Sequence, residues 1–347
     1  MKKVLQHNTL ENKDFTKNTL VEIKDLIVHY ETDDGVVEAV NNVSLNIQKG
    51  EVLGLVGETG AGKTTIALSI MNLLPKPPAH VISGEIYLEG EDLMKKGKKE
   101  LHKIRGQKIS MVFQDPMTAL NPVQTVGAQI AEVIQLHNSK MAPSEIKEHA
   151  VKMLETVGIP GSRYNDYPHQ FSGGMKQRVI IAIALACEPE LIIADEPTTA
   201  LDVTIQAQVL ELMKQLQKNF GTAMLLITHD FGVVADICNR CAVIYAGEIV
   251  ESGTVEHIFD RPMHPYTIGL FDSLPSMDKD VERLKPIRGN VADPTELPPY
   301  CSFYDRCDYC TKECKEQNPT LKEVEPGHFV KCIHKVKRKG DEDNGAY

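Results

Sequence analysis

A glycine-rich turn is the first segment of the chain whose residues could carry out chemistry. Residues 57–64 read Gly-Glu-Thr-Gly-Ala-Gly-Lys-Thr and satisfy the pattern G-x-x-x-x-G-K-[ST]. Glycines allow a tight turn whose N–H groups point at one anion, and the following helix adds its positive end. Lys63 would supply a charge for the β- and γ-phosphates, and the Thr64 hydroxyl would be a ligand for Mg²⁺. The predicted nucleotide-binding residues are Gly57, Glu58, Thr59, Gly60, Ala61, Gly62, Lys63, Thr64 and Thr65.

Two adjacent carboxylates follow an apolar run further along the chain. Residues 191–194 read Leu-Ile-Ile-Ala, and Asp195 and Glu196 come next. Ligands bind at the carboxyl ends of strands in parallel sheets, so these side chains are expected near the phosphates. Asp195 suits a contact to Mg²⁺, direct or through water. Glu196 suits a general base for an attacking water, a role that typically contributes about 10²–10⁴-fold.

Buried strands must position these residues. Residues 52–56 form a nearly continuous apolar run, as expected for a strand covered on both faces. The segment 66–74 has apolar residues at helical spacing and ends at Pro75. A second strand is predicted at 191–194, a helix at 205–220 and a third strand at 223–227. The alternation predicts a doubly wound α/β fold.

Short strands are predicted before this core. Apolar residues at 26–28, 36–40 and 43–47 are separated by turn signals at 33–35 and 41–42.

The domain boundaries follow from changes in composition. Residues 1–20 are predicted to be a flexible tail, and 21–260 to be the nucleotide-binding domain, with a helical insertion at about 116–178. After Asp260 prolines become frequent and cysteines gather, which predicts an extension at 261–335. The charged stretch 336–347 is predicted to be disordered.

The composition sets limits on the class of protein. Apolar residues make up 42% and charged residues 25% of the 347 residues, which fits a soluble globular protein. No apolar stretch approaches the ~20 residues that span a bilayer, and the N-terminus lacks the apolar part of a signal peptide. We therefore expect a cytoplasmic chain, where disulfides are rare. The net charge of −10 argues against nucleic acid as a partner.

Residues 171–178, Phe-Ser-Gly-Gly-Met-Lys-Gln-Arg, offer a second anion site. Ser172, followed by two glycines and an apolar run, predicts an N-capped helix with exposed amides. The segment resembles the signature sequence of the ABC family, commonly Leu-Ser-Gly-Gly-Gln. The resemblance implies a head-to-tail dimer in which each signature contacts the nucleotide held by the other subunit's phosphate turn. The signature residues are Ser172, Gly173, Gly174 and Met175, and the departures are Phe171 for Leu and Met175 for Gln.

Three further segments resemble motifs of this family in their usual order. Gln114, in Val-Phe-Gln-Asp-Pro, resembles the Q-loop residue that touches Mg²⁺ and water and reports to the membrane subunit. Asp202, in Ala-Leu-Asp, resembles the D-loop. His229, in Ile-Thr-His-Asp, resembles the switch histidine that senses the γ-phosphate.

Tyr30 is a candidate for the aromatic residue that stacks on adenine, and nearby Phe15 and His29 are alternatives. The resemblance covers residues 21–335. It implies a P-loop NTPase (RecA-like) ABC nucleotide-binding domain with an antiparallel β subdomain and a helical subdomain. It further implies an ATPase whose catalytic residues are Glu196, His229 and Gln114, and whose Mg²⁺ is held by Thr64, Gln114 and Asp195.

Other segments are similar to one branch, the oligopeptide/dipeptide import ATPases, and to the D-type subunit in particular. They are residues 167–171 (Tyr-Pro-His-Gln-Phe), 261–267 (Arg-Pro-Met-His-Pro-Tyr-Thr) and 301–307 (Cys-Ser-Phe-Tyr-Asp-Arg-Cys). The resemblance implies ATP-driven peptide import at the cytoplasmic face of the inner membrane. The implied partners are a related F-type ATPase, two permeases and an extracytoplasmic binding protein. Near relatives import nickel, so nickel is an alternative solute.

Four cysteines in the extension are spaced Cys301-x₅-Cys307-x₆-Cys314-x₁₇-Cys332. In this branch they are associated with a [4Fe–4S] cluster, which Cys₄ ligation suits. Cys310 could replace one ligand of such a cluster, and two further alternatives stay open. The pair Cys307-x₂-Cys310 has a spacing that suits zinc, and all these thiols could be structural.

Two rival interpretations belong to other classes. A soluble ABC ATPase acting on DNA or ribosomes usually carries two cassettes, long insertions or basic arms, which this chain lacks. A degenerate regulatory subunit is disfavoured because Lys63, Glu196 and His229 are all present.

Overall fold

The computed structural model describes residues 18–114, 116–199, 201–273 and 286–334. The predicted disordered segment 336–347 lies outside these ranges, and so does the predicted tail up to residue 17. The tail was predicted too long, because strand β1 begins at Thr19 and Leu20 is only 2% exposed.

The larger of two sheets has eight strands in the order β11-β12-β10-β9-β3-β8-β7-β6. The five strands from β9 to β6 run parallel, and β10, β12 and β11 continue the sheet in antiparallel pairing. The predicted strand at 52–56 is confirmed to the residue. The strands are β3 (Val52–Val56), β6 (Ile109–Val112), β7 (Leu191–Asp195), β8 (Ala223–Thr228), β9 (Arg240–Tyr245), β10 (Glu248–Thr254), β11 (Lys322–Glu325) and β12 (His328–Val330).

The smaller sheet is antiparallel, as predicted, with the order β2-β1-β4-β5. The turn between its first two strands falls at the predicted Asp33-Asp34, but Asn41-Asn42 does not end a strand. Asn42 adopts a φ of 53° inside β2, where the pairing with β1 shifts register, so the chain bulges and continues. The strands are β1 (Thr19–Thr32), β2 (Gly35–Gln48), β4 (Ala79–Leu88) and β5 (Glu91–Asp92).

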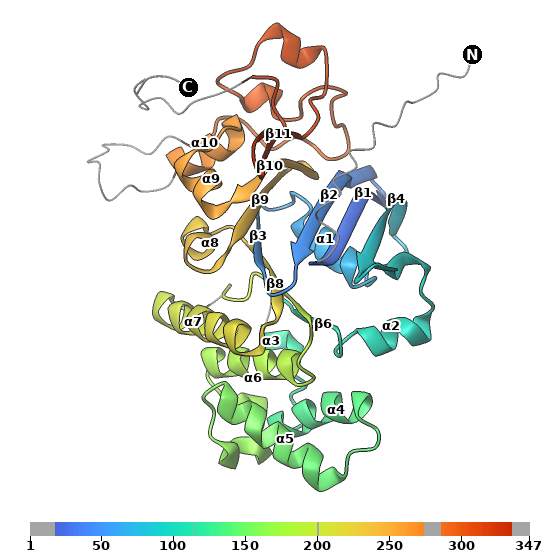
Figure 1. Ribbon diagram of the computed structural model, residues 1–347, viewed down its shortest axis with the longest axis vertical. Coiled ribbons are helices and arrows are strands. Elements are labelled where there is room, and N and C mark those ends of the chain that lie inside the picture. The colour runs from blue at the N-terminus through green and yellow to red at the C-terminus, as the bar shows by residue number, and fades with distance from the viewer. Residues whose placement is uncertain (1–17, 115, 200, 274–285, 335–347) are drawn as a thin grey trace.

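Helices cover the large sheet, and α4 and α5, from the range predicted to be an insertion, lie at the opposite end of the molecule from the cysteine-rich segment (Figure 1). Within the described ranges, none of the helices combines the length and the apolar character that crossing a bilayer requires. The α-helices are α1 (Lys63–Ile70), α2 (Lys98–Ile104), α3 (Pro116–Ala119), α4 (Val126–His137), α5 (Pro143–Thr156), α6 (Gly173–Leu185), α7 (Val203–Phe220), α8 (Phe231–Ile237), α9 (Val255–Asp260) and α10 (Pro265–Asp272). The 3₁₀ turns are Leu93–Lys95, Gly161–Asn165, Pro168–Gln170, Tyr304–Arg306 and Lys312–Lys315.

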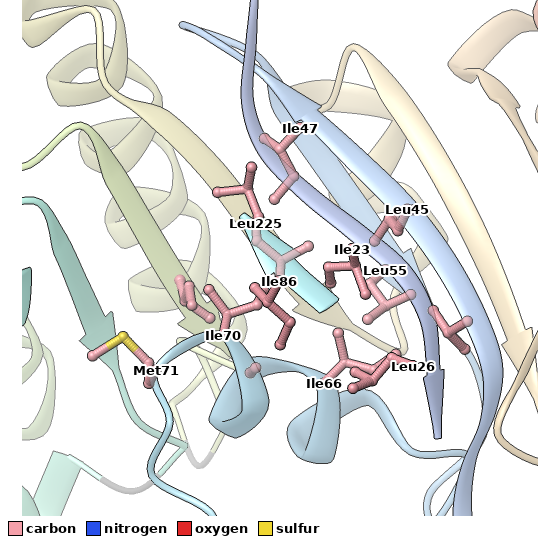
Figure 2. Close-up of a cluster of buried hydrophobic side chains, with 14 of the residues drawn as sticks. Ile23, Leu26, Leu45, Ile47, Leu55, Ile66, Ile70, Met71, Ile86 and Leu225 are labelled. Atoms are coloured by element: carbon pink, nitrogen blue, oxygen red, sulfur yellow. The ribbon is translucent and has the colours of Figure 1, made fainter. Parts of the chain in front are cut away.

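One apolar core joins the two sheets through α1. Ile66 and Ile70 of this helix are buried against Leu55 of β3 and against Ile23 and Leu26 of β1 (Figure 2). Burial of such side chains stabilises the fold by about 1.5–3 kcal/mol each. Because α1 starts at the lysine of the glycine-rich turn, the same core fixes that turn between the sheets.

The segment after Asp260 returns to the large sheet instead of standing apart. Strand β12 pairs with β10, and Phe303 is buried against Tyr245 and Tyr266. The division of the chain at residue 261 stays a prediction.

Glu251 of β10 connects this segment to the sheet. It is fully buried, and its carboxylate accepts hydrogen bonds from the backbone N–H groups of Met263 (2.7 Å) and His264 (3.0 Å). Its other contact is Nε2 of the equally buried His328, at 2.8 Å. The carboxylate therefore satisfies donors from two separate segments, residues 263–264 and strand β12.

We expect Glu251→Ala to lower the free energy of unfolding by about 3–5 kcal/mol, because it leaves buried donors without an acceptor. Glu251→Gln keeps an acceptor oxygen and should lower it by about 1–3 kcal/mol. Urea unfolding of the full chain measures both. The exposed Glu256 provides the control, since Glu256→Ala should change stability by less than about 0.5 kcal/mol. Equal, small effects of all three substitutions would contradict this assignment.

Candidate nucleotide site

Four neighbouring parallel strands end at one edge of the large sheet. They are β3, β8, β7 and β6, which lie side by side in that order. The carboxyl ends of parallel strands are where such sheets bind ligands. The residues that follow these ends are, in the same order, the glycine-rich turn from Gly57, His229, Glu196 and Gln114. Residues predicted from distant parts of the sequence therefore share one edge.

The glycine-rich turn needs glycine for two physical reasons. Gly62 has a φ of 100°, in the left-handed region. A Cβ on Gly62 would lie 2.3 Å from the carbonyl oxygen of Ala39, and one on Gly57 would lie 2.3 Å from that of Ile244. Side chains at these two positions would force the turn away from both sheets.

Lys63 lies across this turn. Its Nζ donates to the carbonyl oxygens of Gly57 (2.7 Å) and Glu58 (3.0 Å). Burial lowers the pKa of Lys63, while the nearby carboxylates of Glu196 and Asp195 act in the opposite direction. The ammonium is therefore held inside the turn, partly removed from water and close to the paired acidic residues.

Glu196 brings the three predicted catalytic residues together. Its Oε2 accepts from Nε2 of Gln114 (2.9 Å), and its Oε1 lies 3.4 Å from Nδ1 of His229. Glu196 has a φ of 45°, which side-chain-bearing residues rarely adopt and which clusters at functional sites. Its carboxylate also accepts from Oγ1 of Thr199 (3.0 Å), a contact that the sequence reasoning missed. The sequence feature that could have indicated this contact is a threonine three residues after the glutamate, in a turn that contains a proline.

Asp195 and Thr64 supply oxygen atoms where the predicted Mg²⁺ would bind. Asp195 is 3% exposed, and burial raises the pKa of its carboxyl while a hydrogen bond with the Thr64 side chain lowers it. Mg²⁺ takes oxygen ligands, often one or two carboxylates together with phosphate oxygens. The donors present therefore fit this cation.

The signature segment begins a helix, as predicted. Oγ of Ser172 accepts from the backbone N–H of Met175 (3.4 Å) and caps α6. A Cβ on Gly174 would lie 2.4 Å from Cγ2 of Ile205, so α6 and α7 approach closely here. Asp202 caps α7 by accepting from the N–H of Ile205 (3.0 Å). The signature segment and Asp202 therefore lie at the starts of two closely packed helices, α6 and α7.

Tyr30 lies on β1, and its hydroxyl is 3.4 Å from Oγ1 of Thr65 in α1. The side chain is half-buried against the core that holds α1. It is therefore close to the helix that follows the glycine-rich turn, and its contact with adenine stays a prediction.

The predicted [4Fe–4S] cluster is wrong. Among the residues that the structure describes, no three His, Cys, Asp or Glu side chains form a group that could hold a metal ion. The same search, over the described ranges, finds no group for the zinc alternative either. The residues concerned are Cys301, Cys307, Cys310, Cys314 and Cys332.

The physical reason lies in the surroundings of these thiols. Cys301 and Cys307 pack against an apolar cluster with Phe303. Burial raises the pKa of Cys301 to about 11 and that of Cys307 to about 12, and it also raises the pKa of Cys332. Metals bind the thiolate, so each of these thiols would first have to lose a proton that its buried surroundings favour. The spacing of the cysteines along the chain therefore did not by itself indicate a metal site, and Cys301 and Cys307 instead pack against apolar side chains.

The fold and the site define a class of protein, an ATPase with the P-loop and the two-sheet architecture of ABC cassettes. The family profile described as "ABC transporter" matches residues 40–199, and the one described as "Oligopeptide/dipeptide transporter, C-terminal region" matches residues 250–314. The chain is similar to the ATP-binding cassette MJ0796, solved as a dimer in a post-hydrolysis state with ADP and Pi. That similarity has a TM-score of 0.61 at 30% identity, over 68% of this chain and 99% of that one.

Comparison with two relatives shows to which branch of the ABC cassettes the chain belongs. The chain is 50% identical to the oligopeptide transport ATP-binding protein OppD of Bacillus subtilis, over 90% of this chain and 88% of that protein. It is 47% identical to the dipeptide transport ATP-binding protein DppD of the same organism, over 90% of this chain and 94% of that protein. The chain belongs to the ABC transporter family, in the branch of the oligopeptide and dipeptide transport ATP-binding proteins.

Proposed function

We propose that this chain is the ATP-hydrolysing subunit that powers peptide import through an ABC transporter. The observation that carries the proposal is the contact of Glu196 with both Gln114 and His229, at the sheet edge that also bears the lysine turn. The oligopeptide and dipeptide proteins among its relatives support the choice of solute.

In the proposed reaction, Lys63 and the turn amides hold the triphosphate, and Tyr30 stacks on adenine. Thr64, Asp195 and Gln114 would hold Mg²⁺, which neutralises charge on the β- and γ-phosphate oxygens when bound. Glu196 orients a water and accepts its proton as the water oxygen bonds to the γ-phosphorus and the bond to ADP breaks. His229 contacts the γ-phosphate.

A second subunit completes each site in this proposal. The N-terminus of α6, with Ser172, Gly173, Gly174 and Met175, would bind the phosphates held by the other ATPase, and Asp202 would line the interface. The dimeric state of the solved cassette MJ0796 supports such pairing. The proposed partners are a related F-type ATPase, two permeases and an extracytoplasmic binding protein. The proposed location is the cytoplasmic face of the inner membrane, where the chain would be peripheral.

A transport assay tests this proposal. The transporter, assembled with its permeases in vesicles, should hydrolyse ATP faster when the binding protein is loaded with peptide, and peptide should accumulate. Nickel salts in place of peptide are the comparison. Stimulation by nickel alone would replace peptide as the solute, and ATP hydrolysis that responds to nucleic acid or ribosomes but not to either solute would overturn the proposal.

A further inference from the structure

An arginine of the extension contacts the phosphate turn. Arg306 donates from Nη1 to Oε2 of Glu58 (2.7 Å) and from Nη2 to Oε1 (3.1 Å), a two-point ion pair across 248 positions of sequence. The side chain of Arg306 is only 6% exposed and that of Glu58 is 29% exposed. Two-point pairs between arginine and carboxylate are among the stronger charge-assisted hydrogen bonds.

The extension fixes both partners of this pair. Nε of Arg306 donates to the carbonyl oxygen of Arg288 in the extension (3.1 Å), and the guanidinium also lies 5.6 Å from the ring centre of Tyr245 in β9. The hydroxyl of Tyr266 accepts from the backbone N–H of Glu58 (3.0 Å). The extension therefore holds this turn residue at its main chain and at its side chain.

The position of Glu58 gives the pair a consequence for ATP. Its carbonyl oxygen accepts from Nζ of Lys63, the side chain assigned to the phosphates. Its own carboxylate is a negative charge on a turn that binds a polyanion, and the only described cation in ion-pair contact with it is Arg306. Without that partner, the carboxylate would repel the triphosphate in a region partly shielded from solvent.

We propose that Arg306 is a positioning residue for ATP, which neutralises Glu58 and makes nucleotide affinity depend on the docking of the C-terminal extension. This inference rests on the proposed function, in which the turn that carries Lys63 holds ATP. It assigns the extension a role in nucleotide binding, through an arginine that lies outside the glycine-rich turn.

Charge-neutral variants of the assembled transporter test this role. Arg306→Gln should raise the KM for ATP about tenfold and change kcat by less than about twofold, because it leaves a partly buried carboxylate without its partner. Adding Glu58→Gln in the same chain removes that carboxylate and should bring KM back to within about threefold of wild type. Arg306→Lys, which keeps the charge and loses the two-point geometry, should raise KM less than Arg306→Gln.

A purely structural role for Arg306 predicts a different pattern. If the arginine only stabilised the extension, the second substitution would not restore KM, and that result would overturn the inference. A KM for Arg306→Gln within twofold of wild type would overturn it as well. The matched control is Arg261→Gln, since Arg261 pairs with Glu325 at 2.8 Å within the extension and should leave KM unchanged. A wild-type transporter that neither bound nor hydrolysed ATP would overturn the proposed function, and this inference with it.

Discussion

Replacing Glu196 with Gln is expected to slow ATP hydrolysis by about 10²–10⁴-fold while ATP affinity changes by less than about threefold. The amide that replaces the carboxylate cannot accept a proton from the attacking water. The substitution changes no volume, and Gln still offers an oxygen to the donors Gln114 and Thr199, so the surrounding contacts persist. The loss should therefore appear in kcat alone.

Nucleotide binding and steady-state hydrolysis by the assembled transporter measure this difference. Glu190 is a matched control, because it precedes the same strand at its amino end, where it pairs with Lys108 at 3.3 Å. Glu190→Gln should hydrolyse ATP at close to the wild-type rate. If Glu196→Gln hydrolysed ATP within tenfold of wild type, Glu196 would not be the general base.

The parallel core was predictable because each of its central strands is buried on both faces. Strands β3, β7 and β8 consist entirely of buried residues, so their apolar runs stand out in the sequence. The antiparallel sheet was less clear. Asn41-Asn42 looks like a turn, and only the pairing of β1 with β2 shows that the residues form a bulge within a continuous strand.

Parts of the candidate site could be predicted where the residues of a motif are neighbours in the sequence. Contacts between residues far apart in the sequence could not be predicted. The glycine-rich turn and the Asp195-Glu196 pair carry their chemistry in adjacent residues. The contact between Glu58 and Arg306 joins positions with no common pattern, so it appears only when the extension packs on the turn. The prediction of a metal cluster at the cysteines was wrong for a related reason. The spacing of cysteines along the chain does not show how deeply each thiol is buried, and burial raises the pKa of a thiol.

Lys63→Ala is expected to weaken ATP binding by about 10–100-fold and to slow hydrolysis by about 10²–10³-fold, because it removes the buried cation that the phosphates would contact. Glu196→Gln, by contrast, should keep its affinity for ATP and lose only hydrolysis. The two variants therefore distinguish the residue that binds the triphosphate from the residue that helps to cleave it. Calorimetric titration with ATP and Mg²⁺ measures the affinity of the full chain. Lys49→Ala is the control, since Lys49 is 52% exposed and pairs with Glu89 on the surface. Unchanged affinity in Lys63→Ala would show that the glycine-rich turn does not bind the nucleotide, because Lys63 is the cation held inside that turn.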